Sequence, residues 1–418
     1  MTYTVGESFR PKGLALLATY SDQTTQRVTE GFAFTPSEPF TEAGEQAVTV
    51  TYEGASAVLY VTVSPGVINP YETVSWSDCK SVVSVSHAHC DLNGQLQANA
   101  KPAFAHLAQT AEHLAISNYY PSVPTYPLDD YEADYGSVPD GVIGSPNAEH
   151  ICFGAYPRMH INSLGSFFSS GNGRTWNGTG WDRDEPIGVG GESWPVVFRN
   201  ILNELQFSDG GGITVNHPKW SQLSAQDITP MLDFDSRVLG IEIFNDSCRT
   251  DTTTNEDFQM NTGWALDLWD EILLTGRRCW GFCVPDHRAE SGAQNGLPWY
   301  GRNILLVPAK TERDCLKAYR DGAFYSKLGT SDLAFTGISL ENGVLTVTAD
   351  GASAISVIID GVPYAYTEPV RIPESAVYVR VEAVKTDGAS VLSGDGFDGT
   401  YADRIFSNPI ILKPLSTT

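Results

Sequence analysis

The stretch Ser81-Val82-Val83-Ser84-Val85-Ser86-His87-Ala88-His89 decides how the central part of the chain is interpreted. Its apolar first half predicts a buried β-strand, and two histidines follow where the strand pattern ends. Because residues two apart on an extended chain lie on the same face, both imidazoles can reach one metal ion. The stretch therefore predicts a strand that presents His87 and His89 as metal ligands, although such a pair alone also occurs by chance.

The segment around this stretch, residues 76–330, alternates apolar strand patterns with helical patterns. Strands are predicted near residues 81–85, 114–117, 212–216, 238–244, 279–284 and 303–307. Helices are predicted near residues 102–112, 194–206, 255–275 and 311–322. Repeated β-then-α units predict a parallel sheet that closes into a TIM-like barrel, with the active site at the C-terminal ends of the strands.

The two flanking segments have a different pattern. Residues 1–64 alternate apolar and polar positions in short runs, which predicts a small β-sandwich. Residues 65–75 are rich in turn signals and predict a linker, and residues 331–418 return to strand patterns. The predicted fold is therefore multidomain, with an N-terminal β-sandwich, a central α/β barrel and a C-terminal β-rich module.

Composition narrows the range of partners. The chain of 418 residues has 50 acidic and 26 basic residues, and a net charge of -24 repels polyanions such as nucleic acids. No apolar run approaches the roughly 20 residues that cross a bilayer, so no membrane span is predicted. Seven scattered cysteines do not suggest a disulfide framework.

Further candidate ligands follow along the central segment. His217 comes directly after the strand pattern of residues 212–216, and Asp286-His287 comes after the strand pattern of residues 279–284. Between them and the first pair lie Glu149, whose carboxylate can bridge two cations, and His160. Each of these residues alone fits an ordinary hydrogen-bonded loop position. Together they predict a metal centre.

Residues 1–64 resemble a bacterial immunoglobulin-like domain. The resemblance rests on Tyr3-x-Val5-Gly6-Glu7, on Gly13-Leu14 followed by Tyr20, and on Gly44 before Val48-Thr49-Val50. It implies a spacer or adhesive module that carries no chemistry of its own.

Residues 76–418 resemble the polymerase-and-histidinol-phosphatase (PHP) family, and within it the carbaryl-hydrolase-like branch. The matching motifs, in order, are His87-Ala88-His89, Glu149, His160 in His-Ile-Asn-Ser-Leu-Gly, His217 in Val-Asn-His-Pro, and Asp286-His287 in the closing position. The branch resemblance adds Gly301-Arg302-Asn303-Ile304-Leu305-Leu306 and Ile405-Phe406-Ser407-Asn408-Pro409-Ile410.

The chain departs from the family pattern at three places. Asn118-Tyr119 stands where the family has an aspartate and a histidine, so the third-metal histidine is missing. Asp91 and Asn93 are the candidate substitutes where the family has Ser-Asp-Gly, and the closing motif is one residue short. Asp286 and His287 therefore point to opposite faces of an extended chain. The resemblance then implies two divalent metal ions and a degenerate third site.

The resemblance implies a metal-dependent phosphoesterase that acts on a small anionic molecule through a metal-bridged hydroxide. His87, His89, Glu149 and Asp286 would hold one cation, and Glu149, His160 and His217 the second; Zn, Mn and Fe all suit these ligands. Asp286 and His287 are the candidate catalytic residues, with His287 as proton donor to the leaving group. Arg302, Arg174 and Lys219 are the candidate residues for binding an anionic group of the substrate.

Two alternatives remain open. The amidohydrolase superfamily also opens with His-x-His, but it usually has a lysine in the middle position, and Lys101 is badly placed for this. Glu149 can serve instead, so hydrolysis of an amide, carbamate or ester stays possible. Alternatively, the chain is a catalytically reduced module that contacts a glycan or a cell surface through its β-domains. For localisation, the lack of signal-peptide features at the chain start favours the cytoplasm, and the alternative is the cell surface or exterior, where immunoglobulin-like modules are common.

Overall fold

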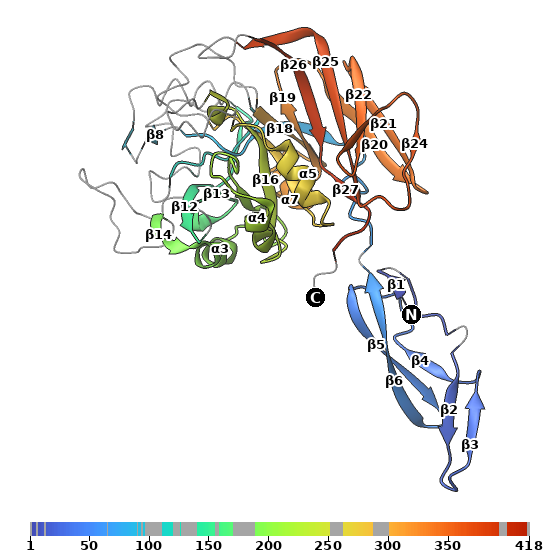
Figure 1. Ribbon diagram of the computed structural model, residues 1–418. Coiled ribbons are helices and arrows are strands. Elements are labelled where there is room, and N and C mark those ends of the chain that lie inside the picture. The colour runs from blue at the N-terminus through green and yellow to red at the C-terminus, as the bar shows by residue number, and fades with distance from the viewer. Residues whose placement is uncertain are drawn as a thin grey trace. The chain divides into compact units, whose positions relative to one another are not determined.

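The computed structural model (Figure 1) divides the chain into two compact units, residues 1–68 with 412–418 and residues 69–411. It describes residues 2–5, 7–11, 14–64, 66–89, 91–92, 95–96, 111–119, 126, 140–154, 159–169, 189–250, 262–286, 301–392 and 399–415.

The first unit consists of two small sheets around one core. A four-stranded sheet has the order β1 (Thr2–Thr4), β6 (Ala55–Ser64), β5 (Gly44–Tyr52), β4 (Ala33–Thr35). A two-stranded sheet pairs β2 (Leu16–Thr19) with β3 (Thr25–Val28). Alternate residues of the long β5–β6 hairpin point inward, as the period of two requires. The core residues are Tyr3, Phe9, Phe40, Val48, Val50, Val61 and Val63.

A six-stranded sheet forms one half of the second unit. Its order is β14 (Val189–Ser193), β12 (Glu149–Phe153), β13 (Met159–Leu164), β15 (Gly212–Val215), β16 (Val238–Asn245), β17 (Trp280–Val284). The β15–β16 and β16–β17 pairs are parallel, whereas β13 is antiparallel to both of its neighbours. The sheet is therefore mixed.

A ten-stranded sheet forms the other half. Its main path is β11 (Ile143–Gly144), β10 (His113–Leu114), β7 (Lys80–Val85), β18 (Gly301–Val307), β19 (Phe324–Leu328), β26 (Gly399–Ser407), β25 (Tyr378–Leu392), β22 (Ala354–Ile359), β23 (Val362–Ala365), and β27 (Ile410–Ile411) pairs with β25. Strands from both sides of residue 331 thus share one sheet. Two smaller sheets are β20 (Ala334–Glu341)–β21 (Val344–Asp350)–β24 (Val370–Arg371) and β8 (Asp91–Leu92)–β9 (Gln95–Leu96).

Four short α-helices occur among the described residues: α3 (Trp194–Asn203), α4 (Ala225–Leu232), α5 (Leu266–Leu273) and α7 (Glu312–Asp321). The helices α3, α4 and α5 pack on strands of the six-stranded sheet, and α7 packs on β18. Thr311 caps α7 by accepting a hydrogen bond from the Asp314 amide, and Gly322 ends the helix at φ 75°. None of the helices formed by described residues is long and apolar enough to span a membrane. Nearly all of the helix expected over 102–112, and residues 255–261 of the one expected over 255–275, lie outside the described residues.

The predicted central TIM-like barrel is wrong. Across the described residues the protein is mostly β-sheet, and the sheets are open, with β14 and β17 at the edges of one and β11 and β23 at the edges of the other. A barrel of this type needs parallel strands joined by helical crossovers. Here β12 and β13 form an antiparallel pair, and β7–β18 and β18–β19 are antiparallel as well. A buried apolar run looks the same in either strand direction, which is why the sequence pattern was misleading.

Along the outer edge of β17, backbone amides donate hydrogen bonds to side-chain oxygens and not to another strand. The Cys283 amide donates to Asn303 Oδ1 at 3.2 Å and to Ser326 Oγ at 3.0 Å. The Gly281 amide donates to Asn408 Oδ1 at 2.9 Å. Because these buried amides already have partners, β17 can end the hydrogen-bonded sheet without leaving backbone groups unsatisfied.

Tyr71, in the segment predicted to be a linker, is only 3% exposed. Its hydroxyl donates to the Phe324 carbonyl oxygen at 2.9 Å and accepts from the Asn408 amide at 2.7 Å. One side chain near the start of the second unit is thus bonded to β19 and to the turn between β26 and β27.

The Tyr71→Phe substitution removes the hydroxyl that accepts a hydrogen bond from the buried backbone amide of Asn408. We expect it to lower the free energy of unfolding of the second unit by about 1–3 kcal/mol, the usual cost of an unsatisfied buried donor. Urea unfolding followed by circular dichroism measures the change. Tyr364→Phe, at a side chain that is 50% exposed, is the matched control and should change little. Equal stability of Tyr71→Phe and the unmodified chain would contradict the assigned role.

Candidate metal centre

Six titratable side chains from five segments of the second unit lie close together. His87 and His89 follow β7, His217 follows β15 and Asp286 follows β17, while Glu149 and His160 lie near the beginnings of β12 and β13. Backbone hydrogen bonds join these segments, for example from the Asp286 amide to the His87 carbonyl oxygen at 3.0 Å. All six residues are buried.

The first group consists of His87, His89 and Asp286, with one oxygen of Glu149 beside it. Asp286 Oδ1 lies 3.2 Å from His87 Nε2 and 3.4 Å from His89 Nε2. Glu149 Oε2 lies 3.0 Å from His89 Nε2 and 3.5 Å from His87 Nε2. Four potential ligand atoms therefore face a common point.

The second group consists of Glu149, His160 and His217. Glu149 Oε1 lies 2.8 Å from His160 Nδ1 and 3.2 Å from His217 Nε2. The two oxygens of Glu149 thus face different groups, Oε2 the first and Oε1 the second.

These residues fit a metal ion on two observations. Ligands about 2.1 Å from a tetrahedral ion lie roughly 3.4 Å apart, which is close to the spacing in the first group. In addition, three of its buried atoms make no hydrogen bond within the described part of the chain: His87 Nε2, Glu149 Oε2 and Asp286 Oδ1. Buried polar atoms are almost always paired in native proteins, so such a set pointing at one place suits a cation.

The imidazole and carboxylate groups shift one another's pKa values. Burial raises the pKa of Glu149, but His160 and His87 lower it further, so this pKa stays well below its usual value. Asp286 behaves in the same way beside His87. Burial lowers the pKa of His87, but the surrounding carboxylates raise it well above its usual value. The carboxylates are thus ionised, and a divalent cation would replace protons on the imidazoles.

Glu242 in β16 supports both groups from behind, and the sequence analysis missed it. Its Oε1 accepts from His87 Nδ1 at 2.6 Å, which directs His87 Nε2 toward the first group. Its Oε2 accepts from the His217 amide at 2.7 Å and from Asn245 Nδ2 at 2.9 Å. The sequence does contain a signal, because Glu242 is the only charged residue in the fully buried strand Val238–Asn245.

Two asparagines extend this support, and the sequence analysis missed these residues as well. Asn245 Nδ2 also donates to Asp286 Oδ2 at 3.1 Å. Asn216 Nδ2 donates to Glu149 Oε1 at 3.2 Å and to Asn162 Oδ1 at 3.0 Å. Each carboxylate ligand is therefore oriented by a neighbouring amide.

Two ligand candidates have strained backbones. His217 has φ 26° and Asp286 has φ 44°, both in the left-handed region that side chains other than glycine rarely adopt. Such strain costs about 1–3 kcal/mol and gathers at functional sites. Each residue lies two positions beyond the end of a strand, and its side chain contacts another ligand candidate, Glu149 for His217 and His87 for Asp286.

Two aromatic rings, those of Tyr119 and Trp220, pack against the ligand histidines. The Tyr119 ring stacks on His89 with centroids 4.7 Å apart and lies 6.0 Å from the His160 ring. Trp220 contacts His217 and His160 with ring centroids 4.9 and 5.3 Å apart.

Two further buried histidines stay outside both groups. His113 contacts Ser84 Oγ at 2.7 Å and Ser145 Oγ at 2.9 Å, and His150 contacts Ser163 Oγ at 2.9 Å. Burial lowers the pKa of each to about 3. They are neutral core residues, unlike His87.

Two of the predicted substrate-binding cations, Lys219 and Arg302, belong to the described residues. Lys219 Nζ is paired with Asp267 at 2.7 Å. Arg302 lies on β18 and is half-buried; burial lowers its pKa, while Asp246 and Asp403 oppose that shift. Arg174 and the predicted proton donor His287 lie outside the described residues, and so do Asn93 and the side chain of Asp91.

Comparison with known proteins identifies the N-terminal segment. Residues 1–63 match the family model of the bacterial Ig-like domain (group 3), which confirms the predicted immunoglobulin-like domain. No curated protein matches the chain.

Among solved structures, the chain is similar to a two-domain protein from Bacteroides vulgatus that contains a predicted PHP-like metal-dependent phosphoesterase. The identity is 11%, the match covers 81% of this chain and 89% of that chain, and the TM-score is 0.36. A likeness this low carries no argument about fold or function, and the carbaryl-hydrolase branch finds no support in it.

Glu242→Gln removes the charge behind His87 and places an amide group opposite the His217 amide. We expect the affinity for Zn²⁺ to fall about 10- to 100-fold, as is typical when the hydrogen-bond partner of a metal-ligating histidine is lost. Competition with a chromophoric chelator measures the affinity. Glu271→Gln, at an exposed position of α5, is the matched control. Equal affinity in the two variants would exclude the supporting role of Glu242.

Proposed function

We propose that the chain is a metal-dependent hydrolase with a binuclear metal centre and that it hydrolyses a small phosphate ester. The observation that supports this best is the position of Glu149. Its two carboxylate oxygens face separate groups of imidazole and carboxylate ligands at 2.8–3.5 Å. A bridging carboxylate is a common device for holding two metal ions side by side in hydrolases.

In this proposal His87, His89 and Asp286 hold one ion, and His160 and His217 hold the other. Mixed imidazole and carboxylate ligands suit Zn, Mn or Fe. Bound divalent ions supply Lewis-acid polarisation of the substrate and lower the pKa of a coordinated water toward neutrality. Glu242, through His87 Nδ1 and the His217 amide, keeps ligands of both groups in place.

The phosphate ester is proposed on the order of motifs along the chain. The series from His87-Ala88-His89 to Asp286-His287 resembles the PHP family and its carbaryl-hydrolase-like branch. By this resemblance Asp286 is a ligand, His287 donates a proton to the leaving group, and Arg174, Arg302 and Lys219 are candidates for binding the anionic group.

Hydrolysis of an amide, carbamate or carboxyl ester on the same site is the second candidate. The observation that favours it is that the two described candidate cations, Lys219 and Arg302, both lie beside carboxylates of the chain. Lys219 forms an ion pair with Asp267, and Arg302 lies near the carboxylates of Asp246 and Asp403. Tyr119 and Trp220 pack against the ligand histidines instead. A less charged substrate needs fewer cations than a phosphate monoester.

Glu149→Gln keeps the size of the bridging side chain but removes its charge. We expect it to lose at least one of the two bound metal ions per chain and to lower kcat at least 100-fold, because both groups share this carboxylate. His217→Ala should lose the ion of the second group. Elemental analysis after dialysis measures metal content. Unchanged metal content in both variants would refute the assignment, and Glu271→Gln serves again as the control.

A substrate panel separates the two candidates. The purified chain, loaded with Mn²⁺ or Zn²⁺, is tested on a phosphomonoester, a phosphodiester, a carboxyl ester and a carbamate that all share one chromogenic leaving group. The proposal predicts that phosphate esters are hydrolysed with the highest kcat/KM and that the activity is lost in Glu149→Gln. A preference for the carbamate or carboxyl ester supports the second candidate. Silence on the whole panel, together with binding on a glycan array, supports a catalytically reduced module.

A further inference from the structure

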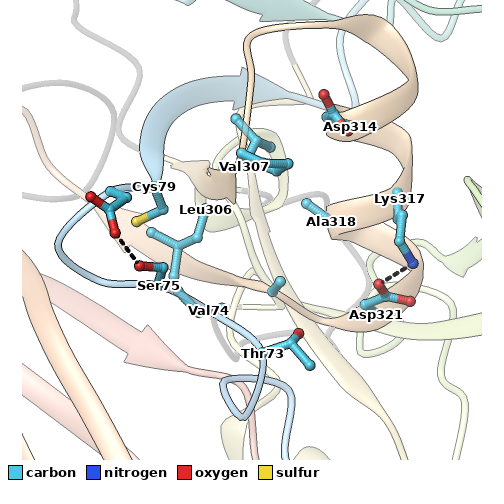
Figure 2. Close-up of a pocket in the computed structure, with 13 residues that line it drawn as sticks. Thr73, Val74, Ser75, Cys79, Leu306, Val307, Asp314, Lys317, Ala318 and Asp321 are labelled. Atoms are coloured by element: carbon cyan, nitrogen blue, oxygen red, sulfur yellow. Dashed lines mark hydrogen bonds and ion pairs between the residues drawn. The ribbon is translucent and has the colours of Figure 1, made fainter.

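A cavity of about 340 Å³ lies in the second unit, away from the metal ligands (Figure 2). Three segments line it: residues 73–79, the end of β18 at residues 306–308, and one face of α7 together with Ala323. Its volume is within the range of about 300–1,000 Å³ that is usual for small-molecule sites. All of the lining residues belong to the described part of the chain.

The floor of the cavity is apolar and buried. Leu306, Val307, Ala318 and Ala323 are each no more than 8% exposed. Figure 2 shows Leu306 and Val307 between the segment of Ser75 and Cys79 and the helix that carries Ala318. The small side chains of Ala318 and Ala323 leave the space open, because neither extends beyond Cβ.

The rim carries more negative than positive charge. Asp78, Asp314 and Asp321 line the cavity together with a single cation, Lys317. Lys317 Nζ is already paired with Asp321 at 2.6 Å. The other two carboxylates are therefore not neutralised by the cation of the rim.

Hydroxyl groups donate hydrogen bonds to both of these carboxylates. Asp78 Oδ2 accepts from Ser75 Oγ at 2.6 Å and from Ser77 Oγ at 2.9 Å, and these bonds lower the pKa of Asp78. Lys80 is close enough to contribute to that shift but makes no ion pair with Asp78. Asp314 Oδ2 accepts from Thr311 Oγ1 at 2.7 Å. Neither aspartate makes an ion pair with any described residue.

We propose that this cavity is a binding site for a small organic cation with an apolar body, such as a protonated amine. The buried floor would remove the apolar body from water, which stabilises the complex in proportion to the area covered. The ammonium group would stay at the rim between Asp78 and Asp314. An anion of the same shape would meet like charge there, so the charge of the rim provides the selectivity.

The site is distinct from the metal centre. In the antiparallel pair of β7 and β18, Lys80 is opposite Val307, at the end of β7 where the cavity lies. His87 follows the other end of β7. A ligand in the cavity therefore does not touch the metal ligands, and the inference does not depend on the proposed hydrolase function.

Three probes of one shape and different charge test the proposal on the full chain: cyclohexylammonium, cyclohexanol and cyclohexanecarboxylate. Isothermal titration calorimetry and saturation-transfer NMR measure binding at neutral pH. We expect saturable binding of cyclohexylammonium, at least fivefold weaker binding of cyclohexanol and no saturation with the carboxylate. Equal affinity for the ammonium and the alcohol, or no saturable binding of the ammonium, would overturn the proposal.

Substitutions locate the probe. Asp78→Asn and Asp314→Asn should each weaken cyclohexylammonium about threefold to fivefold, as expected for one exposed ion pair, and should leave cyclohexanol unchanged. Ala318→Leu fills the cavity and should abolish binding of both. Glu368→Gln, an exposed acidic position outside the cavity, is the control. Unfolding midpoints verify that each variant is folded. Equal loss in Glu368→Gln and the two aspartate variants would identify unspecific attraction by the net charge and refute the site.

Discussion

Glu149 is buried among four imidazole groups and near a second carboxylate, and this concentration of charge constrains the rest of the second unit. Taking ions out of water costs several kcal/mol for each ion unless partners compensate for it. No single strand can supply all of those partners, because alternate residues point to opposite faces of a sheet. The ligands therefore come from several strand ends that must meet with a precision of tenths of an ångström.

The hydrogen bonds behind the ligands fulfil this requirement. Glu242 fixes a side chain of the first group and a backbone amide of the second, so the two groups cannot shift independently. Asn245 connects Glu242 to Asp286, and Asn216 connects Glu149 to β13 through Asn162. The strained φ angles of His217 and Asp286 persist because these contacts over-determine their positions.

The sequence predicts local structure here far better than it predicts topology. The strands at residues 80–85, 238–245 and 280–284 were predicted because each is rich in apolar residues. The direction of pairing was not, because the antiparallel arrangement of β12 and β13 depends on contacts that no local pattern records. The structure brings His87, His89, Glu149, His160, His217 and Asp286 together. Glu242 and Asn216 were missed because a residue that supports a ligand has no spacing rule of its own.

Two residues of the late sequence motifs, Asn303 and Asn408, have a structural role at the edge of β17. Asn303 and Asn408 lie in the two late motifs that suggested a family branch, yet their amides bond to the backbone of β17 and of neighbouring segments. Replacing either with an apolar residue would leave buried amides without partners, whatever reaction the metal centre performs. Motif order in this chain therefore carries both chemical and architectural information. The metal centre itself is indicated by buried ligand atoms that face one another without a hydrogen bond, as His87 Nε2 and Asp286 Oδ1 do.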